Sequence, residues 1–165
     1  MVWLRPRRYG GYNGAARGSD SDSGVSDLDL KRINDRMSVS GQVQPEDMAA
    51  LKALGFTTII NNRPDGESPD QPASDEIAAA AAAAGLAYHA IPLGRDGVTP
   101  DMVERTRDAL QQSTGPVFAF CRSGTRSTTL WALSQAGERP AEEIIAEAAG
   151  AGYDISHLAG HLSRT

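Results

Sequence analysis

One stretch of the chain shows how it is built: Val117-Phe118-Ala119-Phe120-Cys121-Arg122-Ser123-Gly124-Thr125-Arg126-Ser127. Its four apolar residues predict a buried strand, and the polar residues that follow predict a tight loop at Gly124. A helix is predicted over residues 125–135. The backbone N–H groups of such a loop and of the first helical turn have no intrahelical partner, so they can bind an anion. The stretch therefore predicts an anion site between a strand and a helix.

Cys121 is the only cysteine of the chain. It cannot form an internal disulfide or belong to a cysteine cluster, which is compatible with a reducing cytoplasm. The loop amides and Arg126 favour its thiolate form, the form that acts as a nucleophile. An inert buried thiol is the alternative, and so polar a loop disfavours it. Cys121 and Arg126 are thus predicted catalytic residues, with an anion-binding loop made of Arg122, Ser123, Gly124, Thr125 and Ser127.

The 165 residues suit one domain preceded by a tail. Residues 1–26 are rich in Gly, Ser, Asp and Arg and are predicted to be a disordered extension, with the domain at residues 27–165. Turn signals and hydrophobic periodicity predict strands at 28–33, 37–40, 56–61, 86–93 and 117–120, and helices at 45–54, 74–84, 100–112, 125–135, 141–149 and 155–162.

Strands that alternate with helices of this length predict an α/β fold. Crossover helices connect parallel strands, so we expect a central, mostly parallel sheet of four to five strands flanked by helices. In such sheets ligands bind at the carboxyl ends of the strands, where Cys121 lies.

Charge and hydropathy exclude several classes of function. The formal net charge of −5 offers no basic surface for nucleic acid. No apolar run is long enough to cross a membrane, and none follows Arg7-Arg8, so we expect a cytoplasmic protein. His157 and His161 stand four residues apart without a third ligand, so we expect neither a metal nor a cofactor.

Three further motifs, together with the cysteine loop, resemble a known family. They are Ser38-Val39-Ser40-Gly41-Gln42, residues 55–67 and Ala151-Gly152-Tyr153-Asp154. Over about residues 27–158 the chain resembles the phosphatase-like domain family of beta-lactamase-hydrolase-like proteins. The resemblance implies a fold like that of dual-specificity tyrosine phosphatases. Members of the family are described either as phosphatases or as sulfurtransferases, so it implies one of these two activities. It also implies a possible partner, since such domains occur fused to a persulfide dioxygenase.

The spacing within the loop separates those two chemistries. Protein tyrosine phosphatases place five residues between cysteine and arginine, whereas four separate Cys121 from Arg126. This shorter loop is similar to that of rhodanese-like sulfurtransferases. The sequence therefore favours sulfur transfer, in which Cys121 takes sulfur from a small sulfane donor and holds it as a persulfide.

Two alternatives stay open. One is hydrolysis of a phosphomonoester by Cys121 and Arg126, with Asp96 as the general acid, as its place in dual-specificity phosphatases would imply. The other is a noncatalytic thiol redox switch. Turn chemistry favours Asp96 as a turn residue over the role of acid. Arg63 and Asp65 either line the pocket and orient Arg126 or form a turn in which Arg63 pairs with an acid. Ser127 either bonds to the sulfur or simply belongs to the first helical turn.

Overall fold

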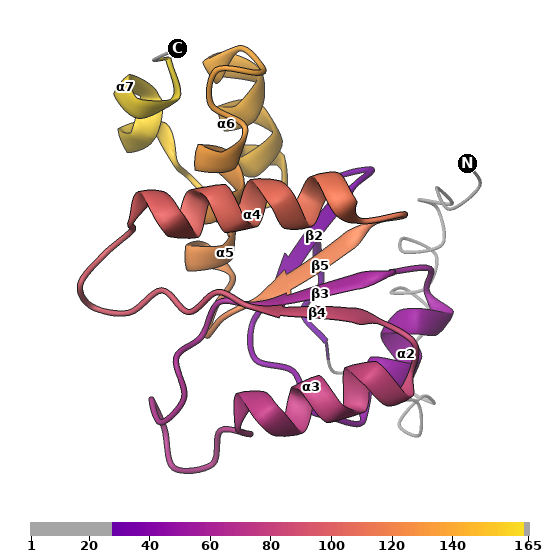
Figure 1. Ribbon diagram of the computed structural model, residues 1–165. Helices are drawn as coiled ribbons and strands as arrows, with labels where there is room; N and C mark the ends of the chain where they lie inside the picture. The colour runs from indigo at the N-terminus through magenta and orange to yellow at the C-terminus, as the bar shows by residue number, and fades with distance from the viewer. Residues whose placement is uncertain (1–27, 164–165) are drawn as a thin grey trace.

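The computed structural model describes residues 28–163, which form a five-stranded sheet with helices on both faces (Figure 1). This confirms the predicted α/β class and the mostly parallel sheet. The predicted extension at residues 1–26 lies outside the described residues. The strands are β1 (Lys31–Asn34), β2 (Met37–Ser40), β3 (Thr58–Asn61), β4 (Ala87–Ala90) and β5 (Val117–Phe120). The helices are α2 (Asp47–Ala53), α3 (Ser74–Ala83), α4 (Pro100–Gln112), α5 (Thr125–Ser134), α6 (Ala141–Gly150), the 3₁₀ helix η3 (Ser156–Leu158) and α7 (Ala159–Leu162).

The sheet has the strand order β1-β2-β5-β3-β4. β2, β5, β3 and β4 are parallel, and β1 pairs with β2 antiparallel. Phe120 at the end of β5 is in register with Ser40 and Asn61, the last residues of β2 and β3. The segments that follow these strands therefore meet at one edge of the sheet.

The core consists of two apolar layers, one on each face of the sheet. Along β5 the side chains alternate, with Val117 and Ala119 in one layer and Phe118 and Phe120 in the other. The first layer packs under α4, α5 and α6, and the second under α2 and α3. Figure 1 shows these two groups of helices on opposite sides of the sheet. Because β5 is buried on both faces, the loop after it starts from a rigid support.

Some element ends differ from the sequence prediction. Ser74 is the first residue of α3 rather than its cap, because Ala73 takes the extended backbone of the cap position and donates its N–H to Glu76 Oε1. β4 ends at Ala90, earlier than predicted. The chain nevertheless continues beside its neighbour, since the Ile91 and Leu93 amides donate to the Asn61 and Asn62 carbonyls. This extension carries Leu93 toward the cysteine loop.

Gly41, directly after β2, allows the cysteine loop to approach closely. A Cβ atom at position 41 would lie 2.7 Å from the Arg122 carbonyl oxygen. We predict that Gly41→Ala lowers the free energy of unfolding by about 1–3 kcal/mol, because backbone must move to admit the methyl group. Urea denaturation measures this change.

The matched control is Gly150→Ala at the end of α6, where no atom lies within 4 Å of the added Cβ. This variant should be as stable as the parent or slightly more stable, since alanine favours helix. Equal stability of Gly41→Ala and the parent would contradict the close approach.

Candidate active site

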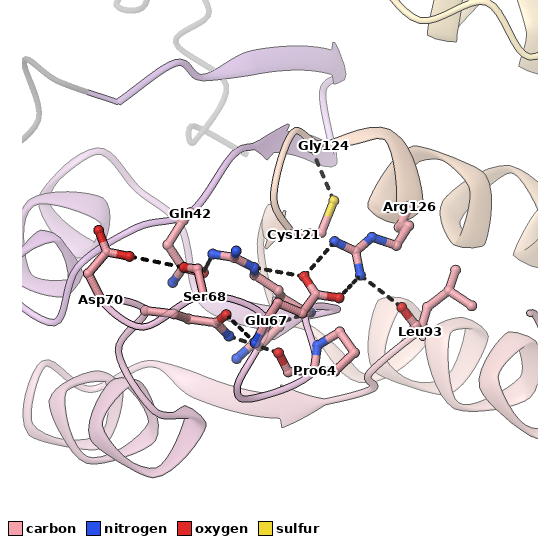
Figure 2. A network of polar contacts seen from close by, with 12 residues as sticks. Gln42, Pro64, Glu67, Ser68, Asp70, Leu93, Cys121, Gly124 and Arg126 are labelled. Carbon is pink, nitrogen blue, oxygen red and sulfur yellow. Dashed lines mark hydrogen bonds and ion pairs between the residues drawn. The ribbon is translucent and has the colours of Figure 1, made fainter. Parts of the chain in front are cut away.

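Cys121 is the first residue after β5 and is held from both sides. Its amide donates to the Ser40 carbonyl at 3.3 Å, and the carbonyl of Phe120 before it accepts from the Asn62 amide at 2.8 Å. The side chain is fully buried. Its sulfur accepts a hydrogen bond from the Gly124 amide at 3.1 Å (Figure 2). Burial alone would suit an inert thiol, whereas a loop amide turned onto the sulfur favours the thiolate.

The loop needs glycine at position 124. Gly124 has φ 92°, in the left-handed region that residues with a Cβ rarely adopt, and it is the N-cap of α5. The helix begins immediately at Thr125, so the loop amides and the first turn lie together. The structure thus brings the predicted loop residues to one place, with Arg122, Ser123 and Thr125 exposed.

Ser127 lies in the first turn of α5 and is buried. Its hydroxyl oxygen has no hydrogen-bond partner among residues 28–163. A buried hydroxyl without a partner costs about 1–3 kcal/mol, so it is a polar group available to a bound molecule. Of the two alternatives for Ser127, the structure shows the place in the first helical turn and not a hydrogen bond to the Cys121 sulfur.

Arg126, on α5, is oriented by Glu67 from the loop between β3 and α3. Its Nη1 and Nη2 donate to the two Glu67 carboxylate oxygens at 2.8 and 3.0 Å, and Nη1 also donates to the Leu93 carbonyl at 3.0 Å (Figure 2). These contacts use both Nη1–H groups and one Nη2–H, and within residues 28–163 no oxygen or nitrogen atom accepts a hydrogen bond from the Nε–H or the second Nη2–H. They form one edge of the guanidinium, which suits bidentate binding of an oxyanion.

Arg126 interacts electrostatically with both Glu67 and Cys121. The hydrogen bond to Glu67 raises the pKa of Arg126, and negative charge on Cys121 contributes in the same direction. The guanidinium therefore lies close enough to stabilise charge on the sulfur. The pKa of Glu67 falls to about 2, chiefly through its hydrogen bond to Arg126 and then through Arg63, against an opposing effect of burial.

Arg63 completes this ionic chain. It is 6% exposed and donates from Nε to Glu67 Oε1 and from Nη1 to Gln42 Oε1, both at 2.9 Å. Arg63 and Arg126 therefore share the Glu67 carboxylate, and the role of Arg63 in orienting Arg126 stays a prediction. Glu67 was not among the residues predicted to form the site. The available signal was its position four residues after Arg63, in a loop that follows a parallel strand.

The two predicted aspartates take different places. Asp65 is exposed and its carboxylate accepts from the Ser74 amide at 2.8 Å, so it stabilises the start of α3. Asp96 is exposed in the turn closed by the Gly97 amide and the Gly94 carbonyl. That turn begins one residue after Leu93, which binds Arg126. Asp96 thus lies on the segment that borders the arginine.

Tyr153 is a second residue at the site for which no role was predicted. Its hydroxyl, from the segment after α6, donates to the Ser123 carbonyl at 3.0 Å. A Cβ at Gly124 would overlap that hydroxyl. Tyr153 stands in the family-like motif at residues 151–154, but no local pattern indicates its contact with Ser123, thirty positions away.

Residues 28–163 contain no group of three or more His, Cys, Asp or Glu side chains placed to hold a metal ion. In the same part of the chain, no helix has the length and apolar character needed to span a bilayer.

Comparison with known proteins gives a consistent family. Residues 29–138 match the family model described as the phosphatase-like domain of beta-lactamase hydrolase-like protein. A beta-lactamase hydrolase-like protein of Agrobacterium fabrum is 42% identical over 105 residues, which cover 64% of this chain and 24% of that protein. One from Xylella fastidiosa is 36% identical over 134 residues, covering 80% and 31%. The chain thus spans about a quarter to a third of the length of these relatives.

Solved structures support the same fold. A candidate phosphatase from Neisseria meningitidis is 32% identical with a TM-score of 0.69, over 81% of this chain and 95% of that one. The core catalytic domain of the PP-IP phosphatase SIW14 from S. cerevisiae, at 14% identity and a TM-score of 0.56, covers 79% and 80%. The second likeness concerns the fold alone.

The low pKa of Glu67 predicts an acid-dependent loss of stability. Unfolded glutamate takes up a proton near pH 4.3, whereas folded Glu67 resists protonation down to about 2. Its ion pairs therefore stabilise the fold fully above pH 4.5, and this contribution is lost as the pH falls toward 2. We predict that Glu67→Gln is less stable than the parent at pH 7 and that the difference shrinks between pH 4.5 and pH 2.5.

Urea denaturation across this pH range measures the difference. Asp108→Asn, at an exposed position within α4, is the control and should remain close to the parent throughout. A pH-independent difference for Glu67→Gln would contradict the ionic chain.

Proposed function

We propose that this chain, which belongs to the family of phosphatase-like domains of beta-lactamase hydrolase-like proteins, hydrolyses small phosphomonoesters through Cys121. The fold is that of a phosphatase-like enzyme. The observation that carries the proposal is the pairing of two features at one sheet edge. The Gly124 amide faces the Cys121 sulfur, and Arg126 keeps one guanidinium edge for an oxyanion.

In the first step the Cys121 thiolate attacks phosphorus, so an S–P bond forms as the P–O bond to the leaving group breaks. The leaving oxygen takes a proton from Asp96, which acts as general acid. Loop amides and Arg126 stabilise the charge on the phosphoryl oxygens.

In the second step a water molecule attacks the thiophosphate. Its proton passes to the Asp96 carboxylate, the S–P bond breaks, and inorganic phosphate leaves with Cys121 again a thiolate. Asp96 is exposed and follows Leu93, whose carbonyl binds Arg126, by three residues, which supports this role.

Sulfur transfer, which the sequence analysis favoured, is the second candidate. The four-residue spacing between Cys121 and Arg126 supports it, whereas the family and the solved relatives support a phosphatase. In this reaction Cys121 attacks the outer sulfur of thiosulfate, an S–S bond forms, and sulfite leaves. A thiolate acceptor then takes the outer sulfur and releases the Cys121 thiolate. No proton donor is required, so Asp96 has no part in it.

The dioxygenase partner and the cytoplasmic location stay predictions. The chain matches only 24–31% of the length of its curated relatives, so their remaining segments lie beyond it.

The test assays the purified chain with para-nitrophenyl phosphate and, separately, with thiosulfate plus a thiol acceptor. We expect phosphate release that Cys121→Ser abolishes and that Asp96→Asn reduces by about 10²-fold or more. Asp108→Asn, the control, should retain full activity.

Persulfide formation that is lost in Cys121→Ser and intact in Asp96→Asn would overturn the phosphatase proposal in favour of sulfur transfer. Oxidation of Cys121 without turnover of either substrate would overturn both and support a redox switch.

A further inference from the structure

One peptide group links Tyr153 to Cys121. The Ser123 carbonyl accepts from the Tyr153 hydroxyl at 3.0 Å, and the amide of the same peptide group, the Gly124 N–H, donates to the Cys121 sulfur at 3.1 Å. The oxygen and the hydrogen of a trans peptide point in opposite directions. The two contacts therefore fix the orientation of this peptide plane from both ends.

We propose that Tyr153 is a positioning residue for the nucleophile: its hydroxyl holds the 123–124 peptide so that the Gly124 N–H faces the Cys121 sulfur. The proposal rests on Cys121 being the reactive group of the proposed function. It assigns a role to a residue that lies beyond the family match at residues 29–138.

The peptide needs such a restraint because of the residue that follows it. Gly124 has no Cβ, so its backbone has a wider choice of conformations than any other residue. Rotation of the peptide by half a turn would point the Ser123 carbonyl oxygen at the sulfur, where it would repel a thiolate. A donor on the opposite side, directed at the carbonyl, disfavours this flip. It also polarises the amide, which strengthens the N–H as a donor.

Tyr153 is well anchored for this task. Its amide donates to the Ala148 carbonyl at 2.9 Å, which fixes the segment to the end of α6. Its ring is partly buried and packs against the core layer that includes Leu130 and Trp131. The hydroxyl is therefore placed by a helix and a packed ring rather than by the loop that it restrains.

The charged groups around the pair favour a neutral tyrosine as donor. Burial raises the pKa of Tyr153, and negative charge on Cys121 and on Asp29 adds to this effect. Asp29 precedes β1 and is paired with Lys31, the first residue of that strand. Arg126, on α5, interacts with the sulfur while bound to Glu67. The tyrosine hydroxyl thus keeps its proton at neutral pH, where the thiolate is needed.

The test follows thiolate absorbance near 240 nm as a function of pH in Tyr153→Phe. Because the chain has one cysteine, subtracting the spectrum of the matching Cys121→Ser variant isolates the signal of that sulfur. We expect the midpoint of thiolate formation to rise by about one pH unit, as the loss of one oriented donor to a thiolate implies. No substrate is involved, so this result stands or fails separately from the phosphatase proposal.

Tyr88→Phe is the matched control. It removes a hydroxyl that bonds to Ser74 Oγ at 2.7 Å and to Asn61 Nδ2 at 3.0 Å, and neither bond involves a residue of the cysteine loop. Its midpoint should equal that of the parent. A midpoint for Tyr153→Phe equal to that of Tyr88→Phe would overturn the proposal.

Amide hydrogen exchange separates positioning from general loosening of the fold. In Tyr153→Phe the Gly124 amide should exchange faster, while the Phe118 amide in the centre of β5 should keep its protection. Equal acceleration at both amides would show that the tyrosine supports the fold as a whole and would also overturn the proposal.

Discussion

The hydrogen bond from the Gly124 amide to the Cys121 sulfur depends on the backbone conformation of the loop and on the position of distant parts of the chain. It requires a left-handed backbone at position 124, which only glycine adopts without strain. It also requires the loop to turn back sharply after β5, so that the Arg122 carbonyl comes close to Gly41. The close approach is possible because β2 and β5 end in register, so that Gly41 and Cys121 lie at the same edge of the sheet.

The charges at that edge alternate in sign along Arg63, Glu67 and Arg126, next to the Cys121 sulfur. Without Glu67 the two arginines would repel each other beside a buried sulfur. With it, each guanidinium is oriented by a carboxylate, and the bond lengths of 2.8–3.0 Å fit charge-assisted hydrogen bonds. The carboxylate occupies one end of Arg126 and leaves the adjacent edge for an anion. The ionic chain therefore orients Arg126 while its Nε–H and second Nη2–H stay free of the Glu67 carboxylate.

The sequence predicted the parts of the site that local chemistry specifies. Cys121, Gly124 and Arg126 lie within six residues. An apolar run precedes the cysteine, the glycine marks the turn, and the arginine lies at the predicted helix start. The roles of Glu67 and Tyr153 were not predicted, because these residues are 59 and 30 positions away in sequence from their partners in the loop, Arg126 and Ser123. Neither has a local pattern that would indicate its partner. Only the order of the strands and the packing of the segment after α6 bring them to the loop.

The same distinction explains why the reaction is harder to infer than the nucleophile. Phosphoryl transfer and sulfur transfer both need a thiolate, loop amides and an arginine, so those residues cannot tell them apart. The difference lies in the leaving group: an alkoxide or phenoxide needs a proton, whereas sulfite leaves from thiosulfate as a stable anion. The discriminating residue is thus Asp96, which lies outside the loop on a separate segment. Under the phosphatase proposal, a proton from Asp96 allows an alkoxide or phenoxide to leave, whereas without that proton only a stable anion such as sulfite leaves readily.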